Sequence, residues 1–187
     1  MNKIIIKKIS PRLFKLRGFD QGSFNNCYNC PCGEDKKGDD CCRRGIFVDK
    51  ETYGLMHKYK KLIEKKIKIP LENCFVKEWK HDPEFLGGDG IATAINPKTD
   101  FCMFHNGKRK GCKLIALVFK HKLPIRTIPS ACRLYPIDWN KGRMFVKKNI
   151  RKGCYCRQKK GPKDKSILET HRKEINDIFK LPKNIKL

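Results

Sequence analysis

The sequence predicts an α+β fold, a single small cysteine-rich domain of short strands and two or three helices. Three observations lead to this fold class. Helical hydrophobic periodicity occurs in two separate stretches, short apolar segments bounded by turn residues recur between them, and 187 residues are enough for one domain with a real core. No internal repeat or linker is visible, so we expect one domain over residues 1–187.

The first predicted helix begins after Asp49, a residue type that caps helix N-termini well. Val48 and Tyr53 stand at the two positions of a hydrophobic staple. One face of the helix then carries apolar residues at the spacing of a buried stripe, and these are Leu55, Met56, Tyr59, Leu62 and Ile63. Lysines occupy the opposite face, which we expect to be exposed.

The middle of the chain predicts shorter elements. Residues 67–90 contain two prolines and a glycine-rich turn, so we expect them to be irregular, with the isolated Cys74 as a small buried side chain. Residues 91–95 predict a strand. A second strand is expected before the turn at Asn106-Gly107. A short helix with inward Leu114, Leu117 and Val118 should follow Cys112, and residues 138–146 predict a hairpin.

The two ends of the chain each predict one element. Residues 4–9 predict a strand, and the aromatic and apolar residues after it, Phe14, Leu16 and Phe19, should pack on the domain. A C-terminal amphipathic helix is expected over residues 165–180, where Ser166 and Glu169 match a capping box. Its buried face would carry Ile167, Leu168, His171, Ile175, Ile178 and Phe179.

Residues 25–42, NNCYNCPCGEDKKGDDCC, hold five cysteines and almost no apolar side chain that a core could bury. A thiolate-bound zinc ion supplies about 10–16 kcal/mol in small metal-dependent peptides. That is comparable to the whole stability of a domain, about 5–15 kcal/mol. We therefore expect this segment to be ordered by a bound ion, and the domain to be packed around a metal-binding centre.

Zinc and iron–sulfur sites need about four soft ligands, and close cysteine pairs present two sulfurs from one local loop. The candidate ligands are Cys27, Cys30, Cys32, Cys41, Cys42, Cys102, Cys112, Cys132, Cys154 and Cys156. Two adjacent cysteines cannot easily reach one ion from an extended chain, so the sequence leaves open whether there is one centre or two. His105, three residues after Cys102, is either a nitrogen ligand or a turn-exposed side chain.

The cellular compartment bears on the state of the thiols. No apolar segment approaches the roughly 18 residues of a membrane helix, and the run at residues 4–6 is too short for a secretory signal. We therefore expect a cytoplasmic protein, in which disulfides rarely persist. Since 11 cysteines cannot all pair internally, metal ligation is favoured over a disulfide scaffold or scattered core cysteines.

The net charge is strongly positive, because 44 lysines and arginines face 19 acids and give +25. Such a charge favours a polyanionic partner, a nucleic acid or another polyanion. Basic residues also cluster beside the cysteines, where they offset the negative charge of a thiolate cage. Lysine outnumbers arginine, and arginine is the residue suited to bidentate phosphate contacts, so a solvated basic surface is the alternative.

The cysteine pattern resembles that of the YkgJ-like cysteine-cluster family, described as zinc- or iron-chelating domains. The CxxCxxCC run of that family is similar to Cys27, Cys30 and Cys32 followed by Cys41-Cys42, with an insertion at residues 33–40. Its later motifs look like Cys102-Met103-Phe104, Gly111-Cys112, Cys132-Arg133-Leu134-Tyr135-Pro136 and Cys154 or Cys156. The resemblance covers residues 25–156 and implies metal binding without a settled reaction.

The sequence thus predicts a metal-binding protein that coordinates zinc or iron, an iron–sulfur cluster included, with Arg43, Arg133 and Tyr135 as outer supports of the ligands. One alternative is a basic nucleic-acid-binding module with a structural metal. Another is an iron–sulfur redox or modifying enzyme. No catalytic residue, substrate or oligomeric state can be read from the pattern, and no Gly-rich phosphate loop is present.

Overall fold

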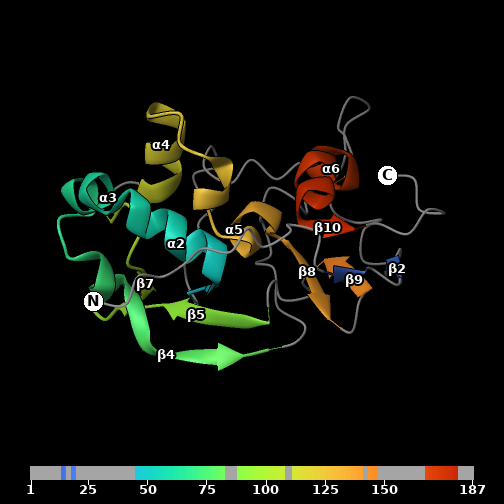
Figure 1. Cartoon of the computed structure of the whole chain (residues 1–187), viewed down its shortest axis with the longest axis horizontal. Coiled ribbons are helices and arrows are strands. Elements are labelled where there is room, and N and C mark those ends of the chain that lie inside the picture. Colours follow the sequence, from blue (N-terminus) through green and yellow to red (C-terminus); the bar gives the residue numbers. More distant parts are fainter. Residues whose placement is uncertain are drawn as a thin grey trace.

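The computed structural model describes residues 14–15, 18–19, 45–82, 88–107, 111–140, 143–146 and 167–180. In these ranges five α-helices and several small sheets form a mixed α+β fold, which confirms the predicted α+β class (Figure 1). The predicted number of two or three helices was too low, because the first predicted helix is divided in two and a short helix at Ser130–Leu134 was not predicted. The strand predicted at residues 4–9, Leu16, and Ser166 of the capping box lie outside the described residues. None of the helices in the described ranges is long and apolar enough to cross a membrane.

The two longest described strands, β4 (Phe75–His81) and β5 (Asp89–Thr93), form an antiparallel sheet with β3 (Phe47–Asp49) in the order β3-β5-β4. The prediction that residues 67–90 are irregular was therefore wrong for β4. Phe75 pairs with Thr93, yet Trp79 pairs with Ile91, so β4 holds two more residues than β5 over this interval. This bulge and the exposure of most of β4 remove the alternating pattern by which a strand is recognised.

The first helix begins where the sequence predicts. The Asp49 carboxylate accepts the Thr52 backbone N–H at 2.8 Å and its hydroxyl at 3.0 Å. The predicted helix is two successive helices, α2 (Lys50–Lys58) and α3 (Lys60–Ile67), because the backbone at Tyr59 departs from helical geometry. Met56 and Ile63 are fully buried, whereas Leu55, Tyr59 and Leu62 are half-buried on the same side.

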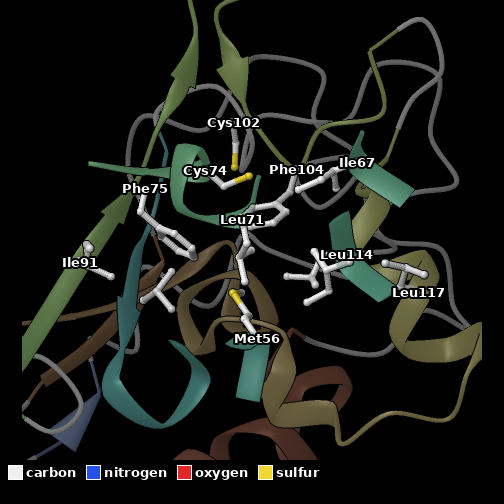
Figure 2. Close-up of a cluster of buried hydrophobic side chains, with 12 residues drawn as sticks. Met56, Ile67, Leu71, Cys74, Phe75, Ile91, Cys102, Phe104, Leu114 and Leu117 are labelled. Atoms are coloured by element: carbon white, nitrogen blue, oxygen red, sulfur yellow. The ribbon is translucent and has the colours of Figure 1, made fainter. Parts of the chain in front are cut away.

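Short elements close the hydrophobic core beneath α2 and α3. They are the 3-10 turn η2 (Leu71–Cys74), the strand pair β6 (Ile95–Asn96) and β7 (Phe101–Cys102), and the helix α4 (Lys113–Lys120). The three residues predicted to point inward from α4 are all buried, which confirms that prediction. Figure 2 shows Leu71 and Leu114 meeting Met56 at the centre of this cluster.

The remaining elements lie on the other side of the molecule (Figure 1). The predicted hairpin is confirmed as β8 (Ile137–Asn140) and β9 (Arg143–Val146), and β2 (Gly18–Phe19) pairs parallel to β9. The C-terminal helix α6 (Ile167–Ile178) runs into β10 (Phe179–Lys180), which pairs parallel with β1 (Phe14–Lys15). On its predicted inner face Ile167, His171, Ile175, Ile178 and Phe179 are buried, and Leu168 is half-buried.

A 3-10 turn η3 (Ile125–Thr127) and the short helix α5 (Ser130–Leu134) connect the two sides of the molecule. α5 packs against β3, β8 and α6, and η3 packs against α2. Arg126 of η3 pairs with Glu51 of α2 and with Asp177 of α6, at 3.3 and 2.8 Å. Ion pairs of Arg126 therefore contribute to the connection between the two sides, in addition to the packing of α5 and η3.

Candidate metal centre

Three of the ten predicted ligands, Cys102, Cys112 and Cys132, belong to the described residues. The other seven lie outside them: Cys27, Cys30, Cys32, Cys41, Cys42, Cys154 and Cys156. Arg43, one of the predicted outer supports, also lies outside. Within the described ranges no three histidine, cysteine or acidic side chains gather as a metal-holding group, and no disulfide joins two of the described cysteines.

Cys102 lies at the end of β7 and is buried in the core cluster. Its Sγ is 3.4 Å from Oγ1 of Thr93, the last residue of β5. Figure 2 places the Cys102 sulfur beside that of Cys74, so two thiols share one apolar corner of the core. Burial of Cys102 follows from the pairing of β7 with β6, which sets Cys102 opposite Ile95.

Cys112 reaches the same cluster from the other end of the 101–112 segment. It forms an antiparallel bridge with His105 and is the N-cap residue of α4. The partial positive charge at a helix N-terminus stabilises a thiolate. The prediction that residues 101–112 reverse direction is thus confirmed, and the reversal brings Cys102 and Cys112 into one apolar cluster, Cys112 at its half-buried margin.

His105 was predicted to be either a nitrogen ligand or a turn-exposed side chain, and it is not exposed, since only 7% of it is accessible. Its ring stacks on Phe101 at a centroid distance of 4.1 Å, which accounts for the burial. Its Nδ1 accepts the backbone N–H of Gly107 at 3.1 Å. In a neutral imidazole the proton then resides on Nε2, so neither nitrogen presents an open lone pair to a metal ion.

Cys74 is fully buried, as predicted. Burial, and then the neighbouring Cys102, raises the pKa of the Cys74 thiol to about 12. Its Sγ points to the carbonyl oxygen of Pro70 at 3.9 Å. A thiol that keeps its proton at neutral pH packs as a small apolar side chain, because metal ions bind the thiolate.

Cys132 lies on α5, half-buried and outside the cluster that holds Cys102 and Cys112. The guanidinium of its neighbour Arg133 is engaged by Glu174 and Asp177 of α6. The backbone carbonyl of Tyr135 lies 3.2 Å from Nε2 of His171. The described partners of both predicted outer supports are therefore on α6.

Thr93 is a residue of this region that the sequence analysis did not single out. Its hydroxyl oxygen accepts the backbone N–H of Ile46 at 2.9 Å, and its own N–H donates to the Ile46 carbonyl at 2.8 Å. A Cβ on Gly45 would meet the Thr93 carbonyl at 2.8 Å, so the two backbones touch. Thr93 thus connects the residues just after the cysteine-rich segment to Cys102, a long-range contact that no local pattern signals.

Comparison of this chain with protein-family models, with curated proteins and with solved structures finds no match in any of the three.

Proposed function

We propose that this protein binds zinc or iron, an iron–sulfur cluster included, through cysteine thiolates, with Cys102 and Cys112 as ligands from the folded core. The observation that carries the proposal is the double contact of Thr93, which touches both Ile46 and Cys102. The likeness of the cysteine pattern to metal-chelating domains supports the same function. The proposal is of binding, and it assigns no reaction.

Chain length supports the convergence of the upstream cysteines on Cys102. Cys42 precedes Gly45 by three residues, and three residues of extended chain span at most about 11 Å. Gly45 lies against the Thr93 backbone, and the Thr93 hydroxyl lies 3.4 Å from the Cys102 sulfur. Cys41 and Cys42 are therefore within reach of an ion bound to Cys102.

The hydrogen bonds of Thr93 show how it could support Cys102 as a ligand. The Thr93 oxygen accepts both the N–H of Ile46 and the thiol proton of Cys102, the latter at 3.4 Å. Once a metal ion displaced the thiol proton, the Thr93 hydroxyl would become the donor and the thiolate the acceptor along the same contact. Thr93 would then orient the ligand, as partners outside the coordination sphere do in other metal sites.

The two remaining predicted ligands in the described ranges differ in what they can contribute. Cys112, at the helix N-terminus of α4 and in the Cys102 cluster, is the better second ligand. Cys132 lies on α5, which packs on β3, the strand that directly follows residues 45–46. His105 is left out of the ligand set because Gly107 occupies its Nδ1.

The test is anaerobic purification of the full chain, followed by elemental analysis and a visible absorption spectrum. We expect zinc with no colour, or iron with an absorbance that bleaches on reduction, the latter indicating a cluster. Cys102→Ser and Cys112→Ser should each lower the bound metal strongly. Thr93→Val, which keeps the shape but removes the hydroxyl, should weaken metal affinity by about tenfold.

The matched control is Cys74→Ala, which removes a neighbouring thiol from the same corner of the core but should leave the metal content unchanged. Circular dichroism would verify that each variant folds. A wild-type chain purified without metal, or a folded Cys102→Ser variant that keeps all of its metal, would overturn the proposal.

A further inference from the structure

A second feature, distinct from the thiols, is a cavity of about 500 Å³ on the surface between the start of α2 and the sheet. Six residues line it: Lys50, Tyr53, Trp79, Lys80, His81 and Asp89. They come from α2, from β5 and from the part of β4 beyond its bulge, where Trp79, Lys80 and His81 pair in regular register with β5. The cavity is therefore built on elements whose positions are held by backbone hydrogen bonds.

The wall of the cavity is aromatic. Trp79 is one of the few large apolar side chains exposed in the part of the chain that the structure describes, with 40% of it accessible. The Tyr53 ring meets it edge to face, with centroids 5.1 Å apart, and Tyr53 in turn packs on the buried Phe75 at 5.0 Å. Trp79 is thus held from one side by the core while its other side is left to solvent.

The rim of the cavity is basic. Asp89 is held by an ion pair with Lys50 and by Nδ1 of His81 at 2.8 Å, and its charge is offset there. Among the described residues no acidic side chain pairs with Lys80, and the described lining carries two lysines against one carboxylate. The cavity therefore combines an indole surface with a net positive rim.

We propose that this cavity binds single-stranded nucleic acid, with one base stacked on Trp79 and backbone phosphate beside Lys80. Stacking on an exposed aromatic side chain combined with lysine contacts to the backbone is how sequence-tolerant single-strand binders work. The chain charge of +25 would draw a polyanion to any of its faces. The exposed indole ring of Trp79 adds a surface on which a base can stack.

A duplex does not suit the cavity, because the bases of a duplex are stacked on one another and present only their edges. A free nucleotide carries the same base and phosphate chemistry, yet it cannot bridge several lysines along the surface. We therefore assign the strand as the ligand. The proposal rests on residues separate from the thiols, so it stands or falls independently of metal binding.

The experiment uses the purified full chain and fluorescein-labelled oligothymidine and oligouridine of about 12 nucleotides, a length within the usual site sizes. Anisotropy titrations at several salt concentrations give the affinity and its salt dependence. Trp79→Ala should weaken binding by about tenfold or more, since base stacking is worth roughly 1–3 kcal/mol. Lys80→Gln should weaken binding and lower the slope of log K against log salt by about 1.

The chain provides a matched charge control. Lys77 is also exposed on β4 but does not line the cavity, so Lys77→Gln should have a clearly smaller effect than Lys80→Gln. The chain has two tryptophans, and in a Trp139→Phe background the fluorescence of Trp79 alone should be quenched by the unlabelled oligomer.

Three results would overturn the proposal. One is an oligomer affinity that Trp79→Ala leaves unchanged, since binding would then be electrostatic and located elsewhere. Another is an equal loss in the Lys77 and Lys80 variants. The third is binding of thymidine or uridine monophosphate with no gain from the longer strand, which would make the ligand a free nucleotide.

Discussion

The guanidinium of Arg133 lies 2.7 Å from the carboxylate of Asp177, although 44 residues separate them in the sequence. Arg133 also donates to Glu174, one turn earlier on α6. Its side chain is only 4% exposed, while the two carboxylates keep 25% and 30% of their surface accessible. An almost buried cation on α5 thus holds α6 against the rest of the fold.

Removing this cation should destabilise the protein. Arg133→Ala would remove the arginine that binds Glu174 and leave Asp177 with Arg126 alone, and we expect a loss of about 2–3 kcal/mol in the free energy of unfolding. Urea denaturation followed by circular dichroism measures it. Arg172→Ala, on the exposed side of the same helix, should change stability by less than about 0.5 kcal/mol. Equal effects of the two substitutions would contradict a special role for Arg133.

The same cluster should make stability depend on acid pH. Partial burial disfavours the charged Asp177, but hydrogen bonds from Arg126 and Arg133 outweigh it and lower the pKa of this carboxyl below its usual value. An unfolded aspartate titrates near about 3.9. The stabilisation is therefore complete above about pH 5 and is lost as the pH falls through the lower pKa of the folded state.

Unfolding free energies measured between pH 3 and pH 7 would test this dependence. Asp177→Asn should flatten the acid side of the curve relative to the wild type. An unchanged slope in the variant would mean that other carboxyl groups account for the acid sensitivity.

Two glycines with the same backbone angle provide a test of close packing near the candidate metal centre. Gly45 and Gly107 both have φ of 66°, but a Cβ on Gly45 would lie 2.8 Å from the Thr93 carbonyl, whereas one on Gly107 meets nothing within 4 Å. Gly107→Ala should cost only the strain of a left-handed backbone, about 1–2 kcal/mol. Gly45→Ala should cost about 1–3 kcal/mol more, because the two backbones must separate.

Thermal denaturation of both glycine variants gives the comparison. Gly45→Ala should also lower the metal content, since it displaces the residues that follow Cys42. Similar melting temperatures for the two variants would show that Gly45 does not pack on Thr93 in solution.

The burial of Cys74 predicts its chemical reactivity. Because the thiol is inaccessible and keeps its proton, iodoacetamide should modify Cys74 slowly in the native protein and rapidly in urea. Peptide mass spectrometry after timed quenching distinguishes the two. Rapid native labelling of Cys74, at a rate similar to that in urea, would mean that the η2 corner opens readily.

Local pattern was enough to predict the elements whose residues repeat regularly or end in a cap. The face of α2 and α3, the inward side of α4, the 138–146 hairpin and the inner face of α6 were all predicted because their apolar spacing or turn residues are local signals. The interruption at Tyr59 was not predicted, since the apolar spacing continues through it.

What the sequence could not show depends on contacts between distant residues. β4 was missed because Phe75 alone is buried and a bulge interrupts its pairing. For His105 the sequence left ligation and exposure open, and its burial against Phe101 accompanies the fold-back that pairs His105 with Cys112. Thr93 and the carboxylate partners of Arg133 lie far along the chain from the residues they contact. The ligand set of the metal centre stays a prediction for the same reason.

The short strand β2 has a consequence for the cysteine-rich residues. Phe19 pairs with Met144 of β9, and Phe47 pairs with Ala92 of β5, so the chain from residue 20 to residue 44 is tethered by hydrogen-bonded strands at both ends. Closing a loop costs conformational entropy, and the strand pairing that fixes residues 19 and 47 has already offset that cost here. Under the proposed metal binding, an ion held by the thiolates of residues 27–42 would have to organise only the interior of this segment, which would favour tight binding by few ligands.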